Sequence, residues 1–219
     1  PGISSAASDV YKRQGFSCIK IKVGALKFES ELQLIKEIRK DFTQKDLEIR
    51  LDANGAFKTN EALEKLERLS EFSIHSIEQP IKKDHWQEMA KLCQLSPIPI
   101  ALDEELIGRN FNKADLLNTI KPDYLILKPS LLGGFKECDN WISLAKEKEV
   151  KWWATSALEG NVGLNAIAQW VYTKNSKLRQ GLGTGMLFKN NVNSPLEISS
   201  DSIYLNKNKK WDLNFFNNN

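Results

Sequence analysis

The sequence predicts an α/β fold of the (β/α) TIM-barrel type, and three observations support this. Short runs of β-branched and apolar residues alternate with stretches of helical periodicity from residue 15 onward. Charged residues stand near the ends of five successive runs at an almost constant spacing. No G-x-G-x-x-G turn follows the first run, which disfavours the competing doubly wound sheet, and the later GLGTG at residues 181–185 is expected to be a loop. The 219 residues fall short of the roughly 250 of a closed barrel, so we expect an incomplete one.

Strands are expected where the apolar runs are short and bounded by turn residues. They cover residues 17–23, 48–52, 74–78, 98–103, 124–128 and 150–155, with a weaker seventh at 178–182. Helices are expected where apolar residues share one helical face, as Leu32, Ile35 and Ile38 do. They cover residues 28–41, 60–72, 84–95, 112–119, 135–148 and 162–172. This alternation predicts βαβ units and a parallel sheet, with Pro97 and Pro122 ending helices just before strands.

The two ends of the chain depart from this alternation and divide it into three parts. Residues 1–14 are small and polar without a period, and are expected to be a disordered or non-native leader. Residues 15–193 hold the barrel domain. Residues 194–219 contain two short alternating runs and no helical pattern, which predicts a tail that packs on another part of the protein.

Composition disfavours several classes of function. The 31 basic and 28 acidic residues leave a charge of +3, too weak to indicate a nucleic-acid or membrane partner. No apolar run reaches the roughly 18 residues of a membrane span, and no signal peptide is visible. Three scattered cysteines form neither a disulfide framework nor a zinc motif, which predicts a cytoplasmic protein. His75 and His85 are too few for a His-rich metal site, and we expect them on loops without a role.

Lys20 and Lys22 are two residues apart in the first expected strand and therefore share one face. An isolated strand of this kind would expose its lysines to solvent. In a parallel strand whose other face is covered by helices, both side chains point into the barrel. Two neighbouring ammonium groups destabilise each other's charged form, so we expect a lysine pKa lowered toward neutrality and a usable general base.

Three carboxylates stand at the ends of the next three strands. Asp52, Glu78 and Asp103 are spaced by about 25 residues, one βα unit, so they should converge on one rim. They would repel one another unless a cation joins them, and all-oxygen ligands suit Mg²⁺ first and Mn²⁺ next. Asn54 follows closely enough to hydrogen-bond in the same site.

Lys128 ends the strand after these three carboxylate strands, which places it across the carboxylates from Lys22. This constellation predicts a reaction on a small-molecule carboxylate. A lysine takes the α-proton of the substrate, while a metal and a second cation stabilise the enediolate.

The sequence resembles the muconate-lactonising subgroup of the enolase superfamily in five motifs: IKIKVG, LDANGAF, IEQP, ALDEEL and LKPS. Two later stretches, TSALEGNVGLNAIAQW and GLGTGMLF, resemble the o-succinylbenzoate synthases of menaquinone biosynthesis. The likeness runs from about residue 15 to the C-terminus. It implies a Mg²⁺-dependent syn-dehydration of 2-succinyl-6-hydroxy-2,4-cyclohexadiene-1-carboxylate to o-succinylbenzoate.

The resemblance also implies a role for each residue. Lys22, the second lysine of K-x-K, would be the general base, with Lys20 assisting it and Lys128 stabilising the enolate from the other face. It further implies an N-terminal capping domain and a first βα unit, so we expect this chain to be N-terminally truncated, with a tail that would pack on the cap. The remaining implied site residues are the three Mg²⁺ ligands and two substrate contacts: Asp52, Glu78, Asp103, Ser156 and Asn54.

Three other hypotheses stay open. A dipeptide epimerase or N-acylamino acid racemase of the same superfamily would use the same two lysines, although dipeptide epimerases usually carry D-x-D where this chain has GLGTG. A barrel without its cap would bind Mg²⁺ weakly and be inactive. A purely structural barrel would leave all six charges solvated. The sequence indicates no oligomeric state.

Overall fold

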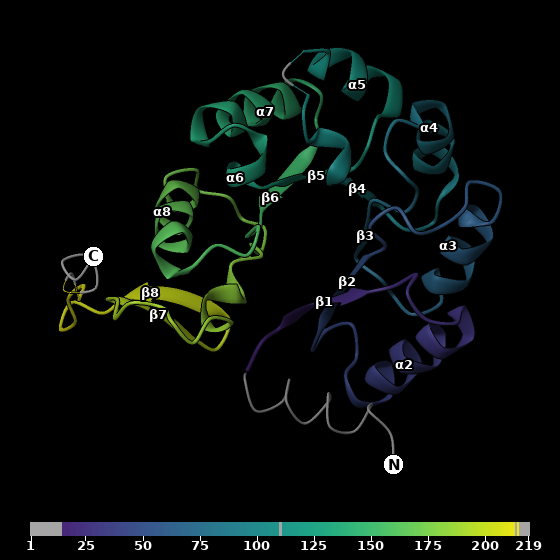
Figure 1. Ribbon diagram of the computed structural model, residues 1–219. Coiled ribbons are helices and arrows are strands. Elements are labelled where there is room, and N and C mark those ends of the chain that lie inside the picture. The colour runs from purple at the N-terminus through teal and green to yellow at the C-terminus, as the bar shows by residue number, and fades with distance from the viewer. Residues whose placement is uncertain (1–14, 110, 213, 215–219) are drawn as a thin grey trace.

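The computed structural model describes residues 15–109, 111–212 and 214, so the expected leader over residues 1–14 lies outside the described part. Its main feature is a parallel sheet whose strand order follows the chain (Figure 1). The six strands are β1 (Cys18–Lys22), β2 (Glu48–Asp52), β3 (Ser76–Glu78), β4 (Ile100–Leu102), β5 (Tyr124–Leu127) and β6 (Lys151–Ala154). Sequential parallel order is that of a (β/α) barrel, whereas a doubly wound sheet reverses its order at a switch point. The predicted fold class is therefore confirmed, as an open barrel.

Helices follow the strands and lie on the outer side of the arc that the strands form (Figure 1). The longer ones are α2 (Phe28–Asp41), α3 (Ala62–Ser70), α4 (Trp86–Leu95), α5 (Lys113–Ile120), α7 (Phe135–Glu147) and α8 (Asn161–Tyr172). Six of the expected strands and all six expected helices are present, and their predicted ends agree with the observed ends to within two residues. None of the described helices has the length and apolar character needed to cross a membrane.

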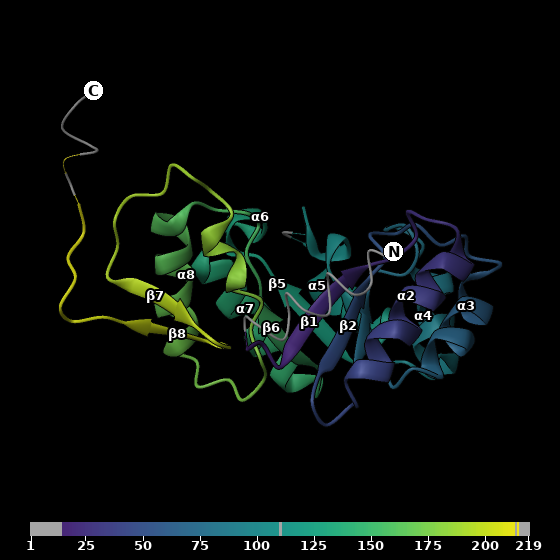
Figure 2. The same cartoon turned by 90° about the horizontal axis from the view of Figure 1, so that it is seen from below.

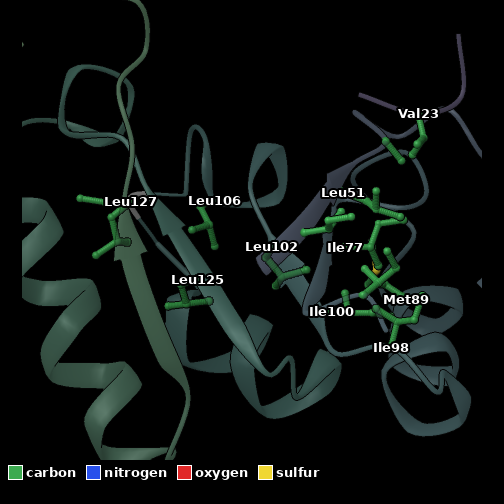
Figure 3. Packing of buried hydrophobic residues seen from close by; sticks show 14 of the residues in the cluster. Val23, Leu51, Ile77, Met89, Ile98, Ile100, Leu102, Leu106, Leu125 and Leu127 are labelled. Atoms are coloured by element: carbon green, nitrogen blue, oxygen red, sulfur yellow. The ribbon is translucent and has the colours of Figure 1, made fainter. Parts of the chain in front are cut away.

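The main core lies between the sheet and these helices (Figure 3). Side chains alternate between the two faces of each strand, so the apolar residues of β2 and β3 point outward. Ile49, Leu51 and Ile77 are fully buried there, in one cluster with Ile35 of α2 and Leu66 of α3. The opposite faces of the same strands are thereby left for polar side chains.

A second, smaller cluster lies on the inner face of the sheet, opposite the helices. It contains Tyr124 and Trp153, and the Arg50 guanidinium lies 4.0 Å from the centre of the Trp153 ring. The ring of His75 lies 5.3 Å from that of Tyr124, centre to centre. His75 stands just before β3, on a loop as expected, and its ring belongs to this interior packing.

The expected seventh strand at residues 178–182 is wrong, because this segment makes only one parallel bridge, between Thr155 and Gly181. The N–H of Gly181 donates to the carbonyl of Ala154 at 2.8 Å, and its own carbonyl accepts the N–H of Ser156 at 3.1 Å. A Cβ on Gly181 would lie 2.6 Å from Oγ1 of Thr155, so glycine is needed for this approach.

The periodicity did not predict three short elements, of which the first follows β4, the second follows β5 and the third follows the Gly181 bridge. They are the 3₁₀ helix η1 (Glu104–Leu106), the helix α6 (Pro129–Leu132) and the 3₁₀ helix η2 (Gly183–Met186). The tail forms two strands, as expected: β7 (Leu196–Ser199) and β8 (Ser202–Leu205) pair antiparallel. This hairpin lies beside α8, apart from the six-stranded sheet (Figures 1 and 2).

The loop between β1 and α2 is held by one buried carboxylate. Oε1 of Glu31 accepts the N–H groups of Gly24, Ala25 and Leu26 at 2.7, 3.0 and 2.9 Å. Glu31 is only 3% exposed. Because the loop begins directly after Lys22, this carboxylate fixes the chain just beyond the two lysines of β1.

We predict that Glu31→Ala lowers the free energy of unfolding by about 1–3 kcal/mol, since three backbone donors lose their acceptor. Urea unfolding followed by circular dichroism measures this. The matched control is Glu37→Ala on the same helix, whose carboxylate pairs with Lys40 near the surface. It should change the free energy by less than about 0.5 kcal/mol. Equal losses in the two variants would contradict the role given to Glu31.

Candidate active site

The parallel register brings the predicted acidic residues to one level. Lys22 is the Cα partner of Asp52, and Asp52 is the partner of Glu78. Asp103 follows two residues after Ala101, the partner of Glu78, so it points to the same face. One oxygen of each of the three carboxylates lies within 4.8 Å of the others, and all three residues are buried. The predicted convergence on one rim is confirmed.

The three predicted lysines surround these carboxylates. Nζ of Lys20 lies 2.8 Å from Oε2 of Glu78 and 3.0 Å from Oδ2 of Asp52. Nζ of Lys22 lies 2.6 Å from the same Asp52 oxygen.

Lys128, which directly follows β5, forms an ion pair with Asp103. Lys22 on β1 and Lys128 after β5 therefore approach the acidic row from its two ends, as their order in the sequence predicted.

Burial and charge set the ionisation of this cluster. Burial raises the pKa of Glu78 to about 8, against the attraction of Lys20. Burial likewise raises the pKa of Asp103, although Lys128 opposes the shift. Burial also acts to raise the pKa of Asp52, but the attraction of Lys20 and the hydrogen bond from Lys22 outweigh it, so this pKa is lowered.

The expected lowering of a lysine pKa is wrong for Lys20. Burial acts in that direction, but the attraction of Glu78 and Asp52 is stronger, and the pKa of Lys20 is raised above its usual value. The physical reason is that Nζ of Lys20 lies within 3.0 Å of an oxygen of each of these two carboxylates.

Asn54 lies in the same cluster. Its Oδ1 accepts a hydrogen bond from Nζ of Lys22 at 2.6 Å, and its N–H donates to Oδ1 of Asp52 at 3.1 Å. Its Nδ2 donates to Oε1 of Glu104 at 2.7 Å. The backbone of Asn54 has a φ of +44°, a left-handed conformation that asparagine tolerates better than most residues. Asn54 thus connects the predicted base to the loop after β4.

Ser156, the other predicted substrate contact, stands just after β6, where its hydroxyl belongs to a loop network. Oγ donates to Oε2 of Glu159 at 2.7 Å and accepts the N–H of Leu158 at 2.8 Å. Glu159 also accepts a hydrogen bond from the hydroxyl of Ser130, after β5. This network connects the loops after β5 and β6.

The acidic cluster fits a hard divalent cation. Its donors are all carboxylate oxygens, which such ions prefer. Among the described residues, two buried acceptors here have no hydrogen-bond partner, Oε1 of Glu78 and Oε2 of Glu104. A buried carboxylate oxygen without a donor is costly, and a bound cation would satisfy it. Asp52, Glu78 and Asp103 are the residues that could hold the ion.

Two buried residues beside these carboxylates were not among the predicted site residues. Gln79 and Glu105 are both fully buried and hydrogen-bonded to each other, with Nε2 of Gln79 lying 3.4 Å from Oε2 of Glu105. Only their positions in the sequence could have indicated them. Gln79 directly follows Glu78 in IEQP, and Glu105 stands two residues after Asp103 in ALDEEL. Periodicity cannot distinguish such residues from solvated loop residues.

Comparison with known proteins gives a consistent result. The model of the enolase C-terminal domain-like family matches residues 2–207. The o-succinylbenzoate synthase of Desulfotalea psychrophila is 52% identical over 186 residues, which are 84% of this chain and 50% of that protein. The L-Ala-D/L-Glu epimerase of Bacillus subtilis is 26% identical over 206 residues, which are 93% of this chain and 56% of that protein.

The crystal structure of MenC from Desulfotalea psychrophila superposes with a TM-score of 0.88 at 45% sequence identity. The match covers 94% of this chain and 58% of that one. The chain thus spans about half the length of the curated relatives it matches.

We predict that Glu78→Gln stabilises the metal-free chain at alkaline pH. The folded-state pKa of Glu78, about 8, lies above its usual 4.5, so the native state holds this proton more tightly than the unfolded state. The unmodified chain therefore loses this stabilisation as pH rises from about 4.5 to about 8, whereas the glutamine variant does not. Urea unfolding in chelator across this range should show a growing advantage of the variant.

The control is Glu67→Gln on α3, where the side chain is exposed. Its free energy of unfolding should follow that of the unmodified chain at each pH. A Glu78→Gln curve parallel to the unmodified one would show that Glu78 is not protonated preferentially in the native state.

Proposed function

Because the chain belongs to the enolase C-terminal domain-like family, we propose that it carries the catalytic centre of an o-succinylbenzoate synthase. The reaction is the syn-dehydration of 2-succinyl-6-hydroxy-2,4-cyclohexadiene-1-carboxylate to o-succinylbenzoate. The observation that carries this proposal is the position of Lys22 and Lys128, which contact the two outer carboxylates of a three-carboxylate row. The identity of 52% to an o-succinylbenzoate synthase supports this reaction over others of the family.

In this mechanism, Nζ of Lys22 in its uncharged form takes the proton from the ring carbon that carries the carboxylate. The electron pair of that C–H bond first moves toward the carboxylate to give an enediolate, and it then forms the new ring C=C bond as the C–O bond to the adjacent hydroxyl breaks. The elimination is syn, so the ammonium group of Lys22 lies on the face from which the hydroxyl departs and returns the proton to it as water. The ring becomes aromatic, and this supplies much of the driving force.

Negative charge builds on the substrate carboxylate as the proton leaves. The ammonium group of Lys128 stabilises it from the far end of the acidic row, and Lys20 adds a second positive charge beside Glu78 and Asp52. Asp52, Glu78 and Asp103 would hold Mg²⁺, or Mn²⁺ as a substitute, which supplies a fixed divalent charge for the same purpose. Because Lys20 is kept charged by its carboxylate neighbours, it serves as an electrostatic group and not as a base.

The substrate contacts complete the proposal. Asn54 lies beside Lys22 and can exchange its hydrogen bond with Lys22 for one to the substrate. Ser156 holds its hydroxyl in the loop after β6, where it would contact the remote part of a small-molecule carboxylate.

The three cysteines, Cys18, Cys93 and Cys138, are free thiols, which supports a cytoplasmic enzyme. This activity would place the enzyme in menaquinone biosynthesis.

A second candidate is racemisation of an N-acylamino acid or epimerisation of a dipeptide. Lysines at both ends of the acidic row favour it, because two bases on opposite faces of a substrate carbon can remove a proton from one side and return it on the other. The 26% identity to an epimerase is in line with this chemistry. Against a dipeptide substrate, the GLGTG segment at residues 181–185 offers no carboxylate for an amino group.

We predict that the 219-residue chain catalyses chelator-sensitive dehydration, followed by the ultraviolet absorbance of substrate and product. Lys22→Ala should lower kcat by about 10²–10⁴, the usual contribution of a general base. Lys128→Ala should lower it by about 10²–10³ through lost charge stabilisation. Lys40→Ala on the surface of α2 is the control and should not alter turnover. Turnover that persists in Lys22→Ala, or a folded Mg²⁺-binding chain without turnover, would contradict the proposal.

We also predict which candidate reaction dominates. An N-succinylamino acid incubated with the chain in D₂O should exchange its α-proton far more slowly than the cyclohexadiene carboxylate is dehydrated. Proton NMR follows the exchange, and chiral chromatography follows racemisation. Racemisation faster than dehydration, lost equally in Lys22→Ala and Lys128→Ala, would favour the second candidate.

A further inference from the structure

Gln79 lies where the segments that follow β2, β3 and β4 meet. It follows Glu78 at the end of β3 and is fully buried. Its N–H donates to the carbonyl of Ala101 at 2.9 Å, and its carbonyl accepts the N–H of Gly55 at 2.7 Å. The backbone has a φ of +39°, so a residue with a side chain is held in a left-handed conformation that costs free energy. The surrounding contacts must maintain this conformation.

The side-chain amide of Gln79 extends these connections to the loop after β4. Oε1 accepts the N–H of Asp103 at 3.3 Å and the N–H of Glu105 at 3.2 Å. Nε2 donates to the carbonyl of Ile81 at 3.1 Å and lies 3.4 Å from Oε2 of Glu105. One side chain therefore joins the residue next to Glu78 directly to the backbone of Asp103.

Glu105 holds the other side of this connection. Its carboxylate is fully buried and accepts Nε1 of Trp86 at 2.8 Å and the N–H of Asp84 at 3.1 Å. Nη2 of Arg109 lies 3.2 Å away. With three further donors from two loops, Glu105 cannot move freely, so Gln79 is anchored to a rigid partner.

We propose that Gln79 is a positioning residue that sets the separation of the Glu78 and Asp103 carboxylates and thereby makes the site selective for a small divalent ion. This inference rests on the metal site of the proposed function. Mg²⁺ requires near-octahedral oxygen ligands at about 2.0–2.1 Å, whereas Ca²⁺ accepts about 2.3–2.6 Å and irregular geometry. A loop freed from Gln79 would let the two carboxylates move apart, which the larger ion tolerates and the smaller ion does not.

The test is the affinity of the chain for Mg²⁺ and Ca²⁺ in Gln79→Met, measured by isothermal titration calorimetry. The methionine side chain fills nearly the same volume but cannot accept the N–H groups of Asp103 and Glu105. We expect the Mg²⁺ affinity to fall by about tenfold or more, in the range typical of residues that support metal ligands. The Ca²⁺ affinity should fall by much less, so the ratio of the two changes.

Asp123→Ala is the matched control, because Oδ2 of Asp123 accepts the N–H of Ile100 at 2.8 Å at the opposite end of β4. It also removes a backbone acceptor next to this strand and should lower stability without altering the affinity ratio. A Gln79→Met chain that is destabilised like the control but keeps the ratio of the unmodified chain would overturn the proposal.

A second pair of variants tests the same contact without relying on methionine. Gln79→Glu keeps the oxygen that accepts the two N–H groups but sets a carboxylate against Glu105, and should weaken Mg²⁺ binding. Adding Glu105→Gln to the Gln79→Glu variant restores a hydrogen-bond donor between the two side chains. The double variant should therefore recover part of the Mg²⁺ affinity. No recovery would count against the inference. These measurements test the metal site independently of the proposed reaction. A chain that shows the expected ion selectivity but no dehydration would contradict the proposed reaction and leave the role of Gln79 supported.

Discussion

The structure depends on one electrostatic constraint, which is that three buried carboxylates lie within 4.8 Å of one another. Such a group is stable only if positive charge is supplied at the same place, because burial and mutual repulsion both disfavour the ionised forms. Lys20 and Lys128 supply part of it, yet the pKa of Glu78 remains raised to about 8. Because the protein compensates this charge only in part, the cluster is one that could hold a further cation.

The parallel sheet brings these groups together through regular strand pairing. Strands in sequential order with matched register place Lys22, Asp52 and Glu78 on one level, and the alternation of faces sends Leu51 and Ile77 to the helices. The interior also divides along the strands. Arg50, which packs against Trp153, precedes Asp52 by two residues on the same face of β2, and the charged cluster lies at the strand ends. The fold thus keeps the packing that stabilises the barrel away from the groups that would do chemistry.

Sequence reasoning recovered what depends on period and spacing. The bounds of α2 and β2, and the convergence of Asp52, Glu78 and Asp103, follow from alternation at about one βα unit. The segment at residues 178–182 was misassigned, because its pattern does not reveal that only Gly181 pairs with β6. The direction in which the pKa of Lys20 moves was also predicted wrongly. That direction depends on how close the ammonium group lies to carboxylates on neighbouring strands, and the spacing of residues along one strand does not give this distance.

Gln79 shows what spacing cannot reveal even when the motif is noticed. A glutamine after a buried acid has no periodic signature, and its importance depends on a left-handed φ and on contacts with a loop about 25 residues further along the chain. Asn54, beside Lys22, also has a left-handed φ and contacts the same loop through Glu104. Left-handed residues with side chains therefore stand directly beyond two of the three acidic strands. Such strain persists only where surrounding contacts over-determine it. We infer that this rim keeps a less favourable backbone because geometry at the carboxylates matters more there than local stability.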